Sequence, residues 1–328
     1  MNNIYYKYIA LDKEFKAVKD ITDIVEPGGN IEYNALTTLK ASIDFTVSIP
    51  KDKEFDLYAV RVYRVINNIE TLLGTFICAY PETETEICQT IDIAGYSTLC
   101  LISDNIPATR YYLPKGTNCV AEIKRILNSL NIAYDIPDCT GATGLNREWA
   151  YKSYLEIIND LLDTVNYTSL YVDVNGTYRA RPYVSNPEPE LTLNCDNLDI
   201  KQKVELTKWG VANRFIRYCG NAPDMDLVAV YDVSSEGDVI VTDVEEIEDS
   251  PDYETLYNRA KNDCYRARSK FKHVELTTDI TTFTNMYMPC ILVNQYSVQN
   301  EIFIVNSFKY NLDISNSMEI NARRSVDV

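Results

Sequence analysis

The chain has no long hydrophobic run, and several residue types that usually carry chemistry are scarce. No segment reaches the roughly 18 apolar residues that a membrane-spanning helix needs. Histidine occurs once, at His273, and glycine and proline number only 11 and 12 among 328 residues. So little glycine and proline argues against extended disorder. The opening residues, MNNIYYKYIALDKEF, lack the apolar core of a secretory signal, so we expect the chain to fold in a cytoplasm.

Cysteine is present, but without the spacing of a zinc or redox site. The nine cysteines are residues 78, 88, 100, 119, 139, 195, 219, 264 and 290. Their number is odd and no two are closer than ten residues, which excludes CxxC pairs of either kind. Scattered cysteines at apolar positions of expected strands and helices are typical of small buried residues in a reducing compartment.

Positive charge is in the minority. The chain has 31 Lys and Arg against 48 Asp and Glu, a formal net charge of −17. Phosphate recognition requires a basic surface, so we expect no direct, sequence-specific binding of nucleic acid. An anionic membrane surface is disfavoured for the same reason, and we expect no membrane insertion by this chain. Solubility is the simplest interpretation of the acidity, and a basic partner protein is the alternative.

Familiar catalytic motifs are missing: there is no G-x-S-x-G elbow, no HExxH and no Walker loop. A lone His273 would need a nucleophile or an orienting carboxylate beside it to act as a general base, so a structural histidine is the simpler interpretation. Gly28-Gly29 indicates a turn between strands and not a phosphate cradle. We therefore predict no catalytic, cofactor-binding or metal-binding residues, and no enzymatic activity.

One stretch, residues 222–256, holds twelve Asp and Glu and no Lys or Arg. A charge run of this kind is usually a solvated loop or face. A calcium site is the alternative, although the ordered D-x-D-x-D-G loop is missing. A pair of glycosidase carboxylates is a further alternative, because sequence does not show the distance between two carboxyl groups. The dense part of the run consists of Asp243, Glu245, Glu246, Glu248, Asp249 and Asp252.

The two tryptophans, Trp149 and Trp209, are candidates for sugar-stacking platforms. Trp149 stands just before an expected helix, and Trp209 stands beside a glycine. Large aromatic side chains are more often packing residues in a core or an interface, which is the interpretation we favour for both.

Strand patterns dominate the N-terminal part. In ASIDFTVSI, residues 41–49, apolar and polar side chains alternate without a break. The apolar stretches 58–66 and 71–80 follow, and Asn67-Asn68 between them is a plausible turn. Short strands at these intervals suggest a small antiparallel sheet or barrel.

Helical patterns begin after about residue 96. A helix is expected near 117–130, capped by Thr117 or Asn118, and a second near 153–166. Ser153 and Glu156 have the spacing of a capping box for the second helix. A hairpin is expected at 168–183, with Asn175-Gly176 as the two positive-φ residues of a type I′ turn.

The chain is rich in strand patterns again from about residue 191, with one helix expected near 251–271. Ser250 would cap this helix and Pro251 would take its first position. We therefore predict an α+β, mainly β fold, in which two small antiparallel β-barrel domains are joined by an α/β middle domain. The expected domains are residues 1–95, 96–190 and 191–328, and the first barrel may take up strands from 191–220.

The order of these patterns resembles that of the baseplate hub proteins of tailed phages and contractile injection systems, a family that includes tail-associated, late-control-D-like hub proteins. The stretches that carry the resemblance are ASIDFTVSIP, VRVYRVINNIETLLGTFI, IDIAGYSTLCLISDN, YLPKGTNCVAEIKRILNSLNI, SYLEIINDLLDTVNYTSLYVDVNGTYRARPY, VANRFIRYCG and EIFIVNSFKYNLDISNSMEINARR. Each stretch is degenerate, and the resemblance rests on their order along nearly the whole chain.

The resemblance implies a structural protein of the virion tail, or of a phage-like particle such as a bacteriocin, assembled in the bacterial host cytoplasm. Such proteins form a homotrimer that acts as a symmetry adaptor between a hexameric tail tube and a three-fold tip. The implied partners are the tube protein, a tip spike or fibre protein, other baseplate proteins and the tape-measure protein. Longer members carry a lytic or fibre domain; this chain stops at Val328, so the resemblance implies no lytic activity.

Two other functions remain as alternatives: a tail-associated cell-wall hydrolase, and a receptor- or glycan-binding tail protein. The hydrolase predicts an acidic cleft with paired carboxyl groups. The binding protein predicts an exposed aromatic patch. The sequence leaves open whether the acidic run at 222–256 lines a channel, where it would limit adhesion of DNA, or binds a metal.

Overall fold

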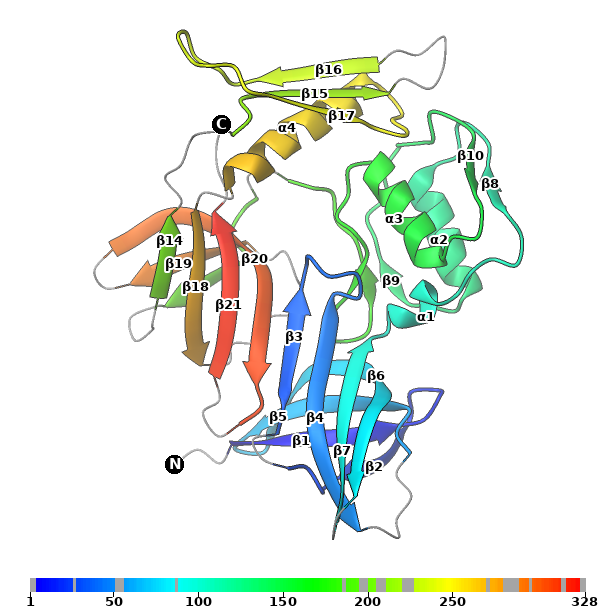
Figure 1. The fold of residues 1–328 in the computed structure, drawn as a ribbon, viewed down its shortest axis with the longest axis vertical. Helices are drawn as coiled ribbons and strands as arrows, with labels where there is room; N and C mark the ends of the chain where they lie inside the picture. The colour runs from blue at the N-terminus through cyan, green and yellow to red at the C-terminus, as the bar shows by residue number, and fades with distance from the viewer. Residues whose placement is uncertain are drawn as a thin grey trace.

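The structure is a computed structural model. It describes residues 4–25, 28–50, 56–85, 88–184, 187–194, 200–204, 211–219, 227–269, 272–279, 289–294, 297–313 and 317–324. The predicted fold class, α+β and mainly β, is confirmed, because strands far outnumber helices in these residues. Figure 1 shows strands from both ends of the chain side by side, the helices α1, α2 and α3 next to them and the helix α4 under a separate small sheet.

The N-terminal strands follow the alternation of apolar and polar residues. In the stretch predicted as a strand, Ile43, Phe45 and Val47 are buried, as a strand with one face on the core requires. Asn67 and Asn68 both have positive φ, 50° and 66°, which confirms the predicted turn. The strands are β1 (Ile4–Leu11), β2 (Ala17–Ile21), β3 (Asn30–Asn34), β4 (Ala41–Pro50), β5 (Ala59–Ile66), β6 (Ile69–Thr85) and β7 (Cys88–Ser97).

Strands from both ends of the chain belong to one sheet. The C-terminal strands are β13 (Leu191–Asn194), β14 (Ile200–Val204), β18 (Lys272–Asp279), β19 (Pro289–Asn294), β20 (Ser297–Asn311) and β21 (Ser317–Arg324). The order is β14-β18-β21-β20-β3-β4-β7-β6-β5-β1-β2; off this path, β19 pairs with β20, and β13 pairs with β19. The two expected barrels therefore take the form of one open series of strands, and no ladder among the described residues closes it. The strands β13 and β14, whose place the sequence left open, pair with β19 and β18.

The long strand β20 joins the two halves. Its first part pairs with β19 and its last part, from Ser307, pairs with β3. Its ladder with β21 changes register between Val305 and Ser307, and Asn306 O accepts a hydrogen bond from Ala35 N at 2.8 Å. Such a bulge bends a strand and re-aims it, so one strand serves two sets of neighbours. The rings of Tyr33 and Phe308 stack across this join, 4.7 Å between centroids.

A helical module with its own hydrophobic core lies beside the sheet. It contains α1 (Cys100–Ser103), α2 (Cys119–Ser129), α3 (Tyr154–Thr164), β8 (Tyr111–Leu113), β9 (Tyr134–Asp135), β10 (Arg147–Trp149), β11 (Tyr171–Val172) and β12 (Tyr178–Arg179). The side chain of Asn118 caps α2, and the predicted capping box of Ser153 and Glu156 opens α3. Asn166 ends this helix in the left-handed region, at φ 57°.

A second module is a three-stranded sheet backed by one helix. It contains β15 (Arg214–Cys219), β16 (Leu227–Asp232), β17 (Thr242–Glu246) and α4 (Tyr253–Ser269). The central strand β15 is antiparallel to β16 and parallel to β17. One face of the sheet packs on α4 through Phe215, Ala260 and Cys264. In Figure 1 this module sits above the rest of the molecule, with α4 on its inner side.

Two local predictions are wrong. Asn175 does not have positive φ; only Gly176 does, at 84°, and the hydrogen bond from Gly176 N to Asp173 O closes a turn one residue earlier. The side chain of Asp173 accepts from the backbone of Asn175 and Thr177, which favours this longer turn over type I′. Helix α4 begins at Tyr253, and Asp252 caps it by accepting from Thr255 N at 2.7 Å; the helix does not start from Ser250.

Candidate functional site

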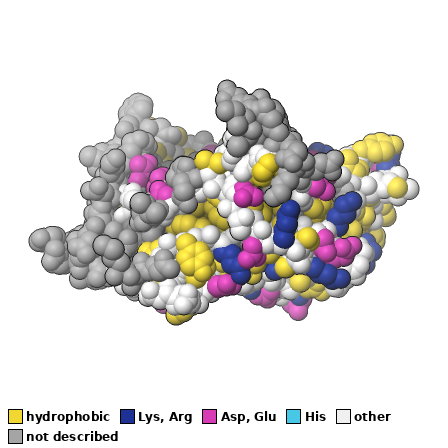
Figure 2. Space-filling view, turned by 90° about the horizontal axis from the view of Figure 1, so that it is seen from below, with side chains coloured by type: hydrophobic (Ala, Val, Ile, Leu, Met, Phe, Trp, Pro, Cys, Tyr) yellow, Lys and Arg dark blue, Asp and Glu magenta, His cyan; other side chains and the backbone are white. Residues whose placement is uncertain are grey.

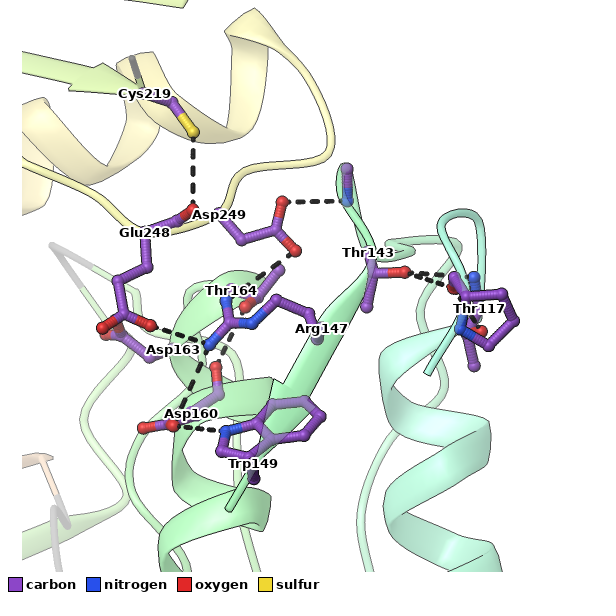
Figure 3. A network of polar contacts seen from close by, with 12 residues as sticks. Thr117, Thr143, Arg147, Trp149, Asp160, Asp163, Thr164, Cys219, Glu248 and Asp249 are labelled. Atoms are coloured by element: carbon purple, nitrogen blue, oxygen red, sulfur yellow. Dashed lines mark hydrogen bonds and ion pairs between the residues drawn. The ribbon is translucent and has the colours of Figure 1, made fainter. Parts of the chain in front are cut away.

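The dense acidic run lies on and after β17, where the α4 module meets the helical module. Asp243, Glu245 and Glu246 belong to β17, Glu248 and Asp249 to the following loop, and Asp252 to the start of α4. All of them are exposed except Asp249, so the predicted solvated face is largely confirmed. Figure 3 shows the loop of Glu248 and Asp249 facing α3 and β10 of the helical module.

A cleft of about 220 Å³ opens at this junction. Strand β10, helix α3, strand β17 with its following loop, and helix α4 each supply part of its wall. Six of its charged residues recur below: Arg147, Asp160, Asp163, Glu248, Asp249 and Arg259. Because Glu245 and Glu246 line it too, carboxylates outnumber guanidinium groups and the cleft is acidic.

Arg147 contacts three of the carboxylates that line the cleft. Its guanidinium lies 3.0 Å from Glu248 Oε2, 3.8 Å from Asp249 Oδ2 and 3.9 Å from Asp160 Oδ2, and only 11% of the side chain is exposed. The guanidinium also stands over the ring of Trp149, 5.0 Å from its centroid. One cation therefore holds carboxylates from two modules together, because Asp160 belongs to α3 and the other two follow β17.

Asp249 is the exception among the six residues of the dense part, because its side chain is fully buried. Gly144 N donates a hydrogen bond of 3.0 Å to its Oδ1. Burial raises the pKa of Asp249 above its ordinary value, while Arg147 and backbone donors oppose the rise. A Cβ at Gly144 would lie 2.7 Å from that same oxygen and 2.4 Å from Ser250 O, so this contact requires glycine.

Trp149 is a packing residue, as we predicted, and not a sugar platform. Only 5% of it is exposed, and its Nε1 donates a hydrogen bond of 2.7 Å to Asp160 Oδ2. Burial raises the pKa of Asp160, and the hydrogen bond from Trp149 works against that rise. The second candidate, Trp209, lies outside the described residues.

Two further arginines bind carboxylates around the same junction. Arg217, on β15, lies 2.7 Å from Asp243, 3.2 Å from Glu245 and 2.7 Å from Asp263 of α4. Arg259, on α4, lies 2.6 Å from Asp163 of α3. These pairs fix β17 and α4 to each other and to the helical module.

The chemistry of the cleft is that of a salt-bridged junction between modules. A glycosidase needs two carboxyl groups facing an open space where a sugar can lie. Here Asp249 is buried, Asp160 receives the indole N–H of Trp149, and Glu248 receives Arg147 at 3.0 Å. Sequence reasoning did not find Arg147, because its partner Glu248 is 101 residues away.

The remaining candidates are placed as follows. The backbone of His273 pairs with Lys203 and Arg323 in the ladders of β18. Among the cysteines whose side chains the structure describes, Cys119, Cys219, Cys264 and Cys290 are buried as predicted, whereas Cys78, Cys100 and Cys139 are half-buried. Within the described stretches, no three or more His, Cys, Asp or Glu residues are grouped so as to hold a metal ion. The same stretches contain no helix with the length and apolar character to cross a membrane.

Comparison with known proteins links the fold to phage tails. No protein-family model matches the chain, and no curated protein does either. Solved structures do match. The tail protein from Neisseria meningitidis MC58 is 12% identical, with a TM-score of 0.70 over 98% of this chain and 96% of that one. The chain has the fold of a tail protein. Because the identity is so low, the likeness concerns the fold alone.

Two more tail proteins share this fold. The 43 kDa tail protein of prophage MuSo2 from Shewanella oneidensis is 12% identical, with a TM-score of 0.68 over 97% of each chain. The prophage tail protein gp18 from Listeria monocytogenes EGD-e is 13% identical, with a TM-score of 0.64 over 97% of this chain and 94% of that one. The three matches span nearly the full length of all the chains, so the likeness is not confined to one module.

Proposed function

We propose that this protein is a structural baseplate hub protein of a phage tail or of a phage-like contractile injection particle. The observation that supports the proposal is the shared fold with three tail proteins, which covers at least 97% of this chain and at least 94% of each of theirs. A likeness over nearly the whole of each chain supports the proposal better than a single shared module would, because unrelated proteins often share one module.

We propose further that three copies form a ring that joins the hexameric tail tube to the three-fold tip. The subunit would consist of residues 1–95, 96–190 and 191–328, with the first and last parts supplying two related sets of strands. Two such sets in each of three copies give six positions around the axis, which suits a six-fold tube. Within the described residues the strand series ends at β2 and β14, so a subunit offers an edge at either end for assembly.

The proposed role is structural and not enzymatic. The clustered carboxylates are bound by Arg147, Arg217 and Arg259, which suits a rigid joint better than a hydrolytic site. The partners in this proposal are the tube protein, a tip spike or fibre protein, other baseplate proteins and the tape-measure protein. The site of action would be the tail baseplate, after assembly in the host cytoplasm.

Two measurements test the proposal. The first is the mass of the purified chain in solution, where a ring would have three times the subunit mass of 37.5 kDa. The second is imaging of the assembled particle by electron microscopy, which remains informative if the ring forms only beside its partners. We expect three copies at the junction of tube and tip. A stable monomer that degrades cell wall and is missing from the particle would refute the proposal.

A further inference from the structure

The outer strand β17 has a free edge. It pairs with β15 on one side, and no described strand lies on its other side. All five of its residues are exposed. Val241 O and Ile247 N both form hydrogen bonds toward β15. Successive residues of a strand direct their backbone N–H and C=O to opposite sides. Val244 is three residues from each of these two, so its N–H points to the free edge. An exposed edge with free amides is a template for an added strand.

The edge is strongly acidic. Asp243 and Glu245 point to the α4 side, where both share Arg217 with Asp263, so one cation stands among three anions. The side chain of Glu246 points to the opposite face of the sheet, because side chains alternate along a strand. The stretch 222–256 supplies no Lys or Arg to offset this charge. By contrast, the underside of the molecule in Figure 2 shows basic and acidic side chains next to each other.

The acidic cleft continues directly from this edge. Glu245 and Glu246 line it together with Asp249, and Asp249 Oδ2 receives no hydrogen bond from any described residue. Arg147 is the nearest cation to that oxygen at 3.8 Å, and it is shared with Glu248 and Asp160. A further ammonium or guanidinium group at the mouth of the cleft would therefore meet excess negative charge.

An apolar row crosses the sheet beside these charges. Val230, Ile216 and Val244 are direct neighbours on β16, β15 and β17, on the face away from α4. Val230 is 43% exposed and Val244 is 59% exposed. A strand added beside β17 would extend this row with one apolar side chain and place its alternate side chains opposite Asp243 and Glu245.

We propose that β17 and the adjoining acidic cleft bind an extended basic segment of another protein, in which Lys or Arg alternates with apolar residues. The partner is a protein of the tail only if the proposed function holds. A second copy of this chain does not fit, because pairing two β17 edges would set Asp243, Glu245 and Glu246 against like charges. The chemistry of the edge therefore selects a basic partner.

The test uses the full chain and three labelled synthetic peptides of ten residues, with binding followed by fluorescence anisotropy. One peptide alternates Lys with Val, a second groups the same residues into a lysine block and a valine block, and a third alternates Glu with Val. We expect only the alternating lysine peptide to bind well, at least tenfold more tightly than either control. Equal binding of the block peptide would overturn the proposal, because it would indicate unspecific attraction of charge.

Variants of the chain locate the site. Val244→Pro removes the N–H that faces the free edge, while Val244→Thr keeps it, and both leave the carboxylates in place. We expect Val244→Pro to weaken binding of the alternating peptide at least tenfold and Val244→Thr to leave it within about twofold. Circular dichroism and thermal unfolding show whether both variants fold. Unchanged binding by a folded Val244→Pro chain would overturn the proposal.

A charge series completes the test. The double variant Asp243→Asn with Glu245→Gln should weaken binding of the alternating lysine peptide about tenfold. The double variant Glu236→Gln with Asp238→Asn changes two carboxylates of the same acidic run that lie off the strand, and it should leave binding unchanged. Equal effects of both pairs would contradict a specific edge. Self-association of the chain that is lost in Val244→Pro would instead assign the edge to a second copy and overturn the proposal. None of these outcomes depends on the mass or the position of the proposed ring. Failure of the peptide-binding proposal can therefore be told apart from failure of the proposed hub function.

Discussion

The buried side chain of Asp249 predicts a pH dependence of its own. Burial raises its pKa, so the folded chain binds this proton more tightly than the unfolded chain does. The stability that this group contributes is therefore greatest below the ordinary pKa of an aspartate, about 4, and is lost as pH rises through the raised value. Asp249→Asn keeps an acceptor for Gly144 N and removes the titration.

We accordingly expect Asp249→Asn to be more stable relative to the parent chain at pH 7 than at pH 4. The measurement is the midpoint of thermal unfolding of both chains at the two pH values. Asp238→Asn, at an exposed position on the loop after β16, is the control for the change of an aspartate to an asparagine. A midpoint of Asp249→Asn that falls relative to that of the parent chain as pH rises would contradict the raised pKa.

For Glu122, in the first turn of α2, the pKa is shifted in the opposite direction to that of Asp249. Burial alone would raise its pKa, but hydrogen bonds from Arg125 and Tyr111 outweigh burial and lower it. The stability it contributes is present above the ordinary pKa of glutamate and is lost as pH falls through the lowered value. We expect Glu122→Gln to destabilise the chain by about 1.5–3 kcal/mol at pH 7, and by clearly less at pH 3, in urea unfolding. An effect independent of pH would refute this.

The contacts of Arg147 and the burial of Asp249 could not be predicted from the sequence. The charge run was visible and its solvated character was correctly predicted. The cation that binds it was not, because an ion pair over 101 residues leaves no local pattern. Burial of one carboxylate among six is decided by which loop docks on it, and that is a property of the tertiary structure.

Helix α3 is an element whose boundaries sequence does determine. Ser153 Oγ accepts a hydrogen bond from Glu156 N at 3.2 Å, and Glu156 Oε2 accepts one from Ser153 N at 2.9 Å. Ser153→Ala should cost about 1 kcal/mol, within a range of about 0.5–2 kcal/mol. Lys152→Ala, which breaks only an exposed ion pair with Glu156, should cost distinctly less, because solvent screens an exposed pair.

Native-state hydrogen exchange of the α3 amides measures both variants, because it reports the free energy of opening of that helix. Equal losses for Ser153→Ala and Lys152→Ala would show that the cap contributes no more than the surface pair. The capping box could be predicted because its partners are three residues apart. The hairpin turn could not be predicted in detail, since the side chain of Asp173 competes with the Asn-Gly preference.

For the whole molecule, the decisive contact is the join between β3 and β20. Phe308 is buried there between Tyr33 and Tyr310, with centroid distances of 4.7 and 5.3 Å. Phe308→Ala should cost about 3–5 kcal/mol, because it opens a cavity in a shared core. Phe308→Leu should cost distinctly less, because it keeps most of the apolar volume.

Hydrogen exchange of strands on both sides of the join is the measurement for this pair of variants. Since β4 and β21 flank β3 and β20, Phe308→Ala should lower the protection of both strands together. Loss of protection in β21 alone would mean that the two halves are stable independently. The mainly β class was predictable from alternation in single strands. The single continuous sheet was not, because the pairing of β3 with β20 is set by a bulge near Asn306.

The pairing of β3 with β20 also sets an order of events at the ribosome. Residues 30–34 emerge early, yet the strand that completes their ladder is made only when synthesis has passed residue 311. For most of translation the nascent polypeptide must carry β3 with one side unpaired, which invites mispairing with neighbouring nascent chains. Slow elongation or loss of a chaperone should therefore reduce the yield of soluble product more than it would for a protein whose strands pair with close neighbours in sequence.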